Sequence, residues 1–203
     1  MRILSLHVLH KRPQKSIFLK SLTSIDFVAY LKRKFVRESL NFAARTTINK
    51  IHKGEMIRVE MEEQPDTFIY AHINDKGIGT VVIADKDYPE SAALKVILEI
   101  ENKFLALYSP AVLEQFTEDQ DLKFPEADAM ITRFQDPKEA DKLIKIEQDL
   151  GEIQHALHKT MNDLMDRGEK LDDLLKQSED ISGLAYNFYS KAKESNQKCC
   201  SLY

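Results

Sequence analysis

The sequence of 203 residues has only two cysteines, and both lie at its C-terminal end, at positions 199 and 200. Two adjacent cysteines cannot staple a secreted fold, and none is left in the preceding residues to act as a nucleophile. Apolar runs stay well short of the about 18 consecutive residues that a membrane-spanning helix needs. The first residues lack the pattern of a signal peptide. We therefore expect a cytosolic protein.

Catalytic and nucleotide-binding motifs are missing as well. The sequence has no G-x-x-x-x-G-K-[ST] loop, which excludes a small GTPase at the motif level, and no H-E-x-x-H or G-x-S-x-G pattern. His155 and His158 are three residues apart without further ligands, and we expect them to face solvent. We predict neither an enzyme nor a metal or cofactor site.

The net charge of −4 conceals a strong segregation of charge along the chain. Residues 1–60 hold 13 Lys or Arg against 4 Asp or Glu, residues 61–137 hold 6 against 16, and residues 138–203 hold 10 against 13. A basic block can attract nucleic acid or anionic lipid. The simpler interpretation is a solvated face neutralised by the acidic middle of the same domain, and we expect no nucleic-acid partner.

The first half of the chain alternates strand and helix patterns. Apolar or alternating runs predict strands, and apolar residues at helical spacing predict two helices, with Pro89 at the start of the second. This order indicates an α+β domain with an antiparallel five-stranded sheet and flanking helices. The predicted strands are 3–9, 16–22, 55–62, 67–73 and 78–84, the helices are 35–51 and 92–107, and residues 109–137 are expected to be irregular packing and linker.

The first predicted helix has two apolar surfaces. One stripe runs from Val36 through Leu40 to Ile51 at helical spacing, and Phe35 and Phe42 lie on roughly the opposite side. One surface suits the helix's own sheet, which leaves the other for a second binding element. Core packing in another register is the alternative for Phe42.

Residues 138–198 carry the strongest pattern in the chain, a heptad seam with steps of three and four. Gly151, Gly168 and Gly183 each weaken a helix by about 1 kcal/mol relative to alanine. We therefore expect the segment to be partly disordered or folded back when free, and fully helical only in a bundle with partner helices. The apolar seam residues are Leu143, Ile146, Leu150, Ile153, Leu157, Leu164, Leu171, Leu174, Ile181, Ala185, Phe188 and Ala192.

Arg167 is the charged member of this seam. A guanidinium inside an apolar layer needs acceptors from the partner helices, and one such polar layer fixes the register of a bundle. The alternative is an arginine at the rim of the bundle that extends to water. The periodicity alone leaves both possibilities open.

The run Leu-Met-Asp-Arg-Gly-Glu-Lys-Leu-Asp-Asp-Leu at 164–174, with seam residues on both sides, resembles the centre of an R-SNARE motif. In that family the arginine meets three glutamines from partner helices in a parallel four-helix bundle. The preceding α+β pattern is similar to the profilin-like longin domain of the same proteins. The whole chain resembles the Ykt-type prenylated longin R-SNAREs of the synaptobrevin-like v-SNARE family. The resemblance implies a longin domain at 1–131, a v-SNARE coiled-coil segment at 138–198 and a lipidation signal at 199–203.

The C-terminal Cys200-Ser-Leu-Tyr has the form of a prenylation box, and Cys199 stands beside it. We expect a prenyl group on Cys200 and a reversible palmitoyl group on Cys199, because two chains anchor stably where one does not. Ser201 and Tyr203 depart from the usual box. They leave farnesyl, geranylgeranyl, two prenyl groups or an unmodified thiol pair open.

The resemblance implies an R-SNARE for vesicle-membrane fusion in intracellular transport, in the cytosol and on the cytoplasmic face of endoplasmic reticulum, Golgi or vesicle membranes. It also implies a closed form, in which Phe35 and Phe42 receive the prenyl chain or the folded-back heptad segment. The alternative is a lipid-anchored adaptor or tether of the same fold that recruits partners by coiled coil without driving fusion. Assembly with three glutamine-type helices, as opposed to self-dimerisation, distinguishes the two.

Overall fold

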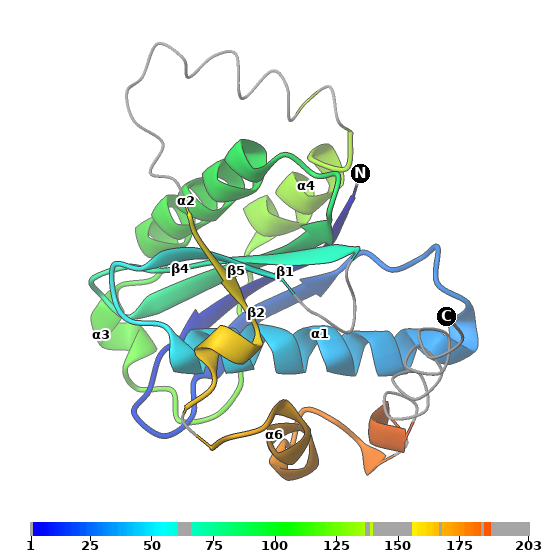
Figure 1. Cartoon of the computed structure of the whole chain (residues 1–203). Helices are drawn as coiled ribbons and strands as arrows, with labels where there is room; N and C mark the ends of the chain where they lie inside the picture. Colours follow the sequence, from blue (N-terminus) through cyan, green and yellow to red (C-terminus); the bar gives the residue numbers. More distant parts are fainter. Residues whose placement is uncertain are drawn as a thin grey trace.

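Figure 1 shows the computed structural model, which describes residues 2–60, 66–136, 139, 156–166, 168–183 and 185–187. A central sheet has helix α1 on one face and helices α2 and α4 on the other. The elements are β1 (Ile3–His10), β2 (Ile17–Thr23), α1 (Tyr30–Lys50), β3 (Met56–Glu60), β4 (Thr67–Ile73), β5 (Ile78–Asp85), α2 (Glu90–Leu107), α3 (Pro110–Leu113), α4 (Pro125–Arg133), β6 (Leu157–Thr160), the 3-10 turn η1 (Asn162–Leu164) and α6 (Leu171–Gln177).

The sheet confirms the predicted α+β class and corrects the number of strands. Its order is β2-β1-β5-β4-β3-β6, and the five predicted strands pair antiparallel. The sixth strand, β6, pairs parallel to β3, with Leu157 opposite Ile57 and Thr160 opposite Glu60. These residues belong to the heptad segment, which the periodicity assigns to a helix. Here they instead satisfy the backbone hydrogen-bonding groups at the open edge of β3.

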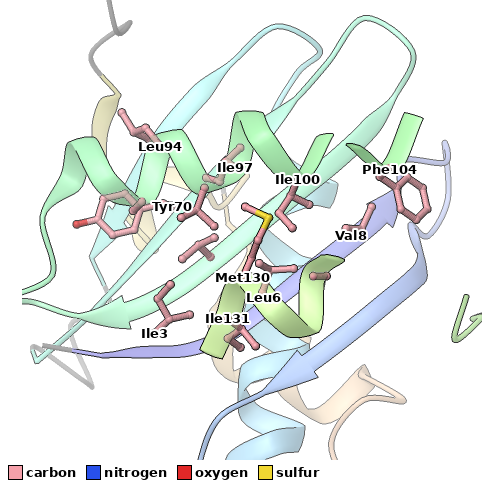
Figure 2. Packing of buried hydrophobic residues seen from close by; sticks show 14 of the residues in the cluster. Ile3, Leu6, Val8, Tyr70, Leu94, Ile97, Ile100, Phe104, Met130 and Ile131 are labelled. Atoms are coloured by element: carbon pink, nitrogen blue, oxygen red, sulfur yellow. The ribbon is translucent and has the colours of Figure 1, made fainter. Parts of the chain in front are cut away.

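Helices α2 and α4 cover one face of the sheet. Ile97, Ile100 and Phe104 recur at helical spacing along α2 and are fully buried. They point toward Leu6 and Val8, which alternate to the same face of β1 (Figure 2). This face forms a hydrophobic core of its own.

The structure corrects several boundaries. Residues 109–137, expected to be irregular, contain α3 and α4. Helix α4 has Pro125 at its first turn, and it buries Ala127, Met130 and Ile131 against α2 and β1. Helix α1 begins at Tyr30, five residues before its predicted start. The sequence pattern missed this first turn because its side chains are largely exposed and do not extend the apolar stripe. Helix α2 likewise begins two residues before its predicted range.

Two contacts fix α1 on the other face of the sheet. A Cβ atom on Gly79 of β5 would lie 2.6 Å from Cδ1 of Ile48, so only glycine permits this close approach. Nζ of Lys11 donates hydrogen bonds to the carbonyl oxygens of Ile48, Asn49 and Ile51 at 2.9, 3.0 and 2.6 Å. These bonds satisfy acceptors at the C-terminal end of α1, where a cation is favoured.

Candidate functional site

The described residues between 156 and 187 are called the C-terminal segment below. Its first residues form β6 on the edge of β3, and the residues from Met161 onward lie along α1 on the side away from α2 (Figure 1). Helix α6 turns Leu171 and Leu175 inward, and both are buried. Residues of the segment share one hydrophobic cluster with residues of α1 and of the α1-facing side of the sheet. From the segment this cluster buries Met161, Leu164, Leu171, Leu175, Ile181 and Ala185.

Phe42 lies where α1 meets this segment. Its side chain is only 5% exposed and belongs to the shared cluster. Together with Leu174 it lines a cleft of about 260 Å³ between α1 and α6. Phe35 is half-buried against the same cluster, about two turns nearer the start of the helix. The second apolar surface of α1 therefore faces the heptad segment in this structure.

The described seam residues differ in burial. Leu164, Leu171, Ile181 and Ala185 are buried, Leu174 is half-buried, and Leu157 on β6 is 57% exposed. The remaining predicted site residues lie outside the described residues. They are Leu143, Ile146, Leu150, Ile153, Phe188, Ala192, the central Arg167, and the cysteines Cys199 and Cys200.

A buried arginine of α1 joins the segment to the rest of the fold. Arg45 is 4% exposed, and its guanidinium donates to both carboxylate oxygens of Asp180 at 2.6 and 2.9 Å. It also donates to both carboxylate oxygens of Asp119 at 3.0 and 2.6 Å. The carbonyl oxygen of Ser16 accepts a further hydrogen bond, and the guanidinium carbon lies 4.4 Å from the centre of the Phe18 ring. Such bidentate pairs combine energy with geometric specificity.

These contacts keep the charges in place. Burial lowers the pKa of Arg45, but its hydrogen bonds to Asp119 and Asp180 outweigh burial and raise it. Burial raises the pKa of Asp119, and its hydrogen bonds with Arg45 and with the backbone N–H of Phe18 more than reverse that shift. Arg45 and Asp119 therefore both stay charged at neutral pH.

Further ion pairs follow the same boundary. Nζ of Lys50, at the end of α1, lies 2.7 Å from Asp166 and 2.5 Å from Glu169. The carboxylate of Glu38 accepts hydrogen bonds from the backbone N–H and the hydroxyl of Ser182 at 3.1 and 2.7 Å. Arg45 and Lys50 of α1 thus form ion pairs with acidic residues of the segment, in addition to the apolar contact between the two.

The ion pairs extend the sequence-based explanation that the acidic middle of the chain neutralises the basic N-terminal block. Lys20 pairs with Asp121, as neutralisation by the acidic middle predicts. Lys15 instead pairs with Glu179 of the segment, as Lys50 does with its two acids. The basic N-terminal block is therefore neutralised from both later blocks. His158 lies 3.1 Å from Glu90, with most of its side chain exposed.

Sequence reasoning missed the role of Arg45. The residue stands between alanines and threonines on a helix with no glycine or proline, which is a local signal for a buried cation. Its partners Asp119 and Asp180 are 74 and 135 residues away. No local spacing in the sequence connects them.

The fold and the segment on it define a class, a profilin-like domain followed by a SNARE motif. Residues 27–131 match the model of the Longin family, described as a regulated-SNARE-like domain, and residues 142–201 match the model of the Synaptobrevin family. Curated relatives are similar over the full length of the chain. The chain is 30% identical to the synaptobrevin homolog ykt6 of Schizosaccharomyces pombe over 202 residues and 31% identical to the VAMP-like protein YKT61 of Arabidopsis thaliana over 204 residues, with 100% of both chains covered in each case.

The chain belongs to the longin R-SNARE family that includes the YKT6 proteins. This membership confirms the resemblance drawn from the seam and from its central arginine. It identifies the chain as a non-enzymatic SNARE of vesicle fusion. Within the part of the chain that the structure describes, no helix is both long enough and apolar enough to cross a bilayer.

Proposed function

We propose that the chain drives fusion by contributing one helix, with Arg167 in its central layer, to a bundle with three glutamine-type SNARE helices. The longin domain, residues 1–131, controls access to the SNARE segment at 138–198. Lipids on Cys199 and Cys200, in the signal at 199–203, hold the protein on the cytoplasmic face of membranes of the endoplasmic reticulum, the Golgi or vesicles. Family membership and the seam pattern support this proposal.

The proposal that the longin domain controls access rests on side chains that α1 and the four-helix bundle would each bury. Leu164, Leu171 and Ile181 are seam residues, and all three are buried in the cluster with α1. A side chain cannot lie against α1 and inside a four-helix bundle at once. The arrangement on α1 is therefore a closed form that competes with bundle assembly, and partner helices shift the balance by binding the open form.

Phe42→Glu tests this closed form. A carboxylate in the apolar cluster loses its hydration without gaining a partner, so the variant is expected to release the segment. Bundle assembly with three soluble glutamine-type SNARE motifs then becomes faster, and recruitment to membranes increases. Leu98→Glu, on exposed surface of α2, is the matched control. Thermal unfolding verifies that both variants are folded, and unchanged assembly and recruitment for folded Phe42→Glu would exclude Phe42 from the closure.

Arg167→Ala tests the bundle. The apolar layers still pair in this variant, but the polar layer no longer fixes their register, so assembly becomes slower and less selective for glutamine-type partners. Unchanged partner choice and unchanged fusion of reconstituted vesicles would contradict the role. Self-dimerisation without the three partners would instead support a tether.

The intact mass of the protein from its own cells tests the anchor. A mass increment of a prenyl group that is lost in Cys200→Ser, together with loss of membrane partition, supports lipid attachment. The size of the increment identifies the type of prenyl group. An unmodified C-terminus with unchanged partition would contradict it.

A further inference from the structure

The start of α1 and the loop before it present an exposed apolar cluster. Tyr30 and Leu31 are each 83% exposed, and Phe27 in the preceding loop is 56% exposed. Large side chains this exposed and this close together mark interaction surfaces rather than random surface composition. None of the three belongs to the cluster that holds the C-terminal segment.

Basic residues surround this cluster. Lys34 and Arg37 lie four and seven residues after Tyr30, so all three side chains share one face of α1. The guanidinium carbon of Arg2 lies 4.6 Å from the centre of the Phe27 ring. The six residues Arg2, Phe27, Tyr30, Leu31, Lys34 and Arg37 are called the aromatic-basic patch below.

The carboxylates near the patch are largely engaged. Asp26 lies 3.2 Å from Arg33, which also donates to the carbonyl oxygen of Val28. Glu38 accepts two hydrogen bonds from Ser182 and is 3.8 Å from Lys34. The cations Arg2, Lys32, Arg33, Lys34 and Arg37 outnumber these two carboxylates, so the surface around Tyr30 and Leu31 keeps a positive balance.

The N-terminal end of α1 adds to this balance. Its N-cap residue, Ala29, has no polar side chain to accept from the first backbone N–H groups. The helix dipole makes this end favourable for an anion. The patch thus offers apolar side chains for insertion and cationic groups for phosphate at one place.

We propose that the aromatic-basic patch binds an anionic lipid surface directly. Tyrosine and leucine enter the interface between headgroups and acyl chains, while Arg2, Lys34 and Arg37 attract the headgroups. The charge complementarity selects an anionic membrane over a neutral one. The inference depends neither on lipid attachment nor on bundle assembly, and it gives the longin domain a membrane contact of its own.

Sedimentation with vesicles tests the proposal on the full chain purified without lipid modification. We expect binding to vesicles of phosphatidylcholine with phosphatidylserine, little binding to phosphatidylcholine alone, and weakening as salt rises. Lys34→Gln with Arg37→Gln is expected to reduce binding about fivefold for each cation removed. Tyr30→Ser with Leu31→Ser is expected to reduce it without changing the salt dependence.

Matched variants elsewhere on the molecule serve as controls. Lys103→Gln with Lys123→Gln removes two exposed cations, and Leu107→Ser with Val112→Ser removes two exposed apolar side chains. Both controls are expected to bind vesicles as the parent does. Equal losses in controls and patch variants, or equal binding to both vesicle types, would overturn the proposal.

Two further outcomes separate this inference from its alternatives. A photoreactive group at position 31 that joins to residues 188–203 of the same chain, with vesicles present, would show that the patch docks its own C-terminal end and would refute lipid binding. Bundle assembly is measured on the same variants without vesicles. Failed vesicle binding with normal assembly refutes this inference and leaves the proposed function standing.

Discussion

Asp180→Asn is the sharpest perturbation of the closed form, because Asp180 lies off the bundle seam yet contacts a buried arginine. Its side chain is 11% exposed and accepts two hydrogen bonds from Arg45. Hydrogen bonds to charged groups contribute about 1.5–3 kcal/mol each when buried. The amide keeps the shape and one acceptor, and Arg45 keeps Asp119. We therefore expect a net loss of about 2 kcal/mol, which lowers the ratio of closed to open chains about 30-fold.

Amide hydrogen exchange measures this ratio directly. The backbone N–H of Ser182 donates to Glu38 only when the segment lies on α1, so its exchange reports opening. In Asp180→Asn this exchange is expected to accelerate about 30-fold, while amides of α2 such as Ile97 keep their protection. Assembly with glutamine-type SNARE motifs is expected to accelerate in parallel wherever opening limits its rate.

Glu179→Gln is the matched control for this prediction. It makes the same chemical change one residue away, in the exposed pair with Lys15, where a single ion pair contributes little to stability. Exchange at Ser182 is expected to stay near that of the parent protein. If both substitutions changed exchange equally, or if neither did, the Arg45 contact would not stabilise the closed form.

Two further predictions concern the fold that carries the site. Burial lowers the pKa of His7 to about 3, against 6.5 in an unfolded chain, so stability is full above pH 6.5 and falls as the pH drops toward 3. The free energy of unfolding, measured with urea, is expected to fall by about 2 kcal/mol between neutral pH and pH 5. His7→Asn is expected to remove most of that fall, whereas His52→Asn at an exposed position is expected to leave it unchanged. Gly79→Ala is expected to destabilise by about 1–3 kcal/mol through overpacking, and Ile48→Val, which removes the crowded methyl group, is expected to recover part of it in thermal unfolding. A pH dependence that persists in His7→Asn would refute the argument from His7. Additive losses of stability in the Gly79→Ala/Ile48→Val double mutant would refute the argument from overpacking.

The strands and the two long helices are predictable from sequence because each is specified by local periodicity. Strands β1 and β5 are apolar-rich and almost wholly buried in the interior of the sheet, and α2 repeats apolar residues at every turn. Helix α4 could also have been found. Pro125 at its first turn, Glu126 and Asp128 after it, and Met130 and Phe134 at helical spacing are ordinary start and core signals.

The arrangement of the C-terminal segment could not be derived from its own pattern. Its heptads describe the side chains that the proposed bundle buries, and the arrangement on α1 buries a set that overlaps with them only in part. Met161 and Leu175 lie off the seam but are buried, whereas Leu157 lies on it and is exposed. One pattern of apolar residues cannot be optimal both for packing in a bundle and for packing on α1. Strand β6 illustrates this, since its pairing depends on the free edge of β3, a property of another part of the fold.

Substitutions of the two carboxylates that bind Arg45 are expected to have opposite effects, because Asp180 belongs to the C-terminal segment and Asp119 does not. When the segment leaves α1, Arg45 loses Asp180 but keeps Asp119, the Ser16 carbonyl and the Phe18 ring. Opening therefore does not strand an unpaired buried cation, which would cost several kcal/mol. In Asp119→Asn, Asp180 is the one carboxylate left on Arg45, so opening becomes more costly, Ser182 exchange slows and assembly slows. Asp180→Asn accelerates both. If the two variants shifted exchange in the same direction, Arg45 would be a structural ion pair and not the contact that makes closure reversible.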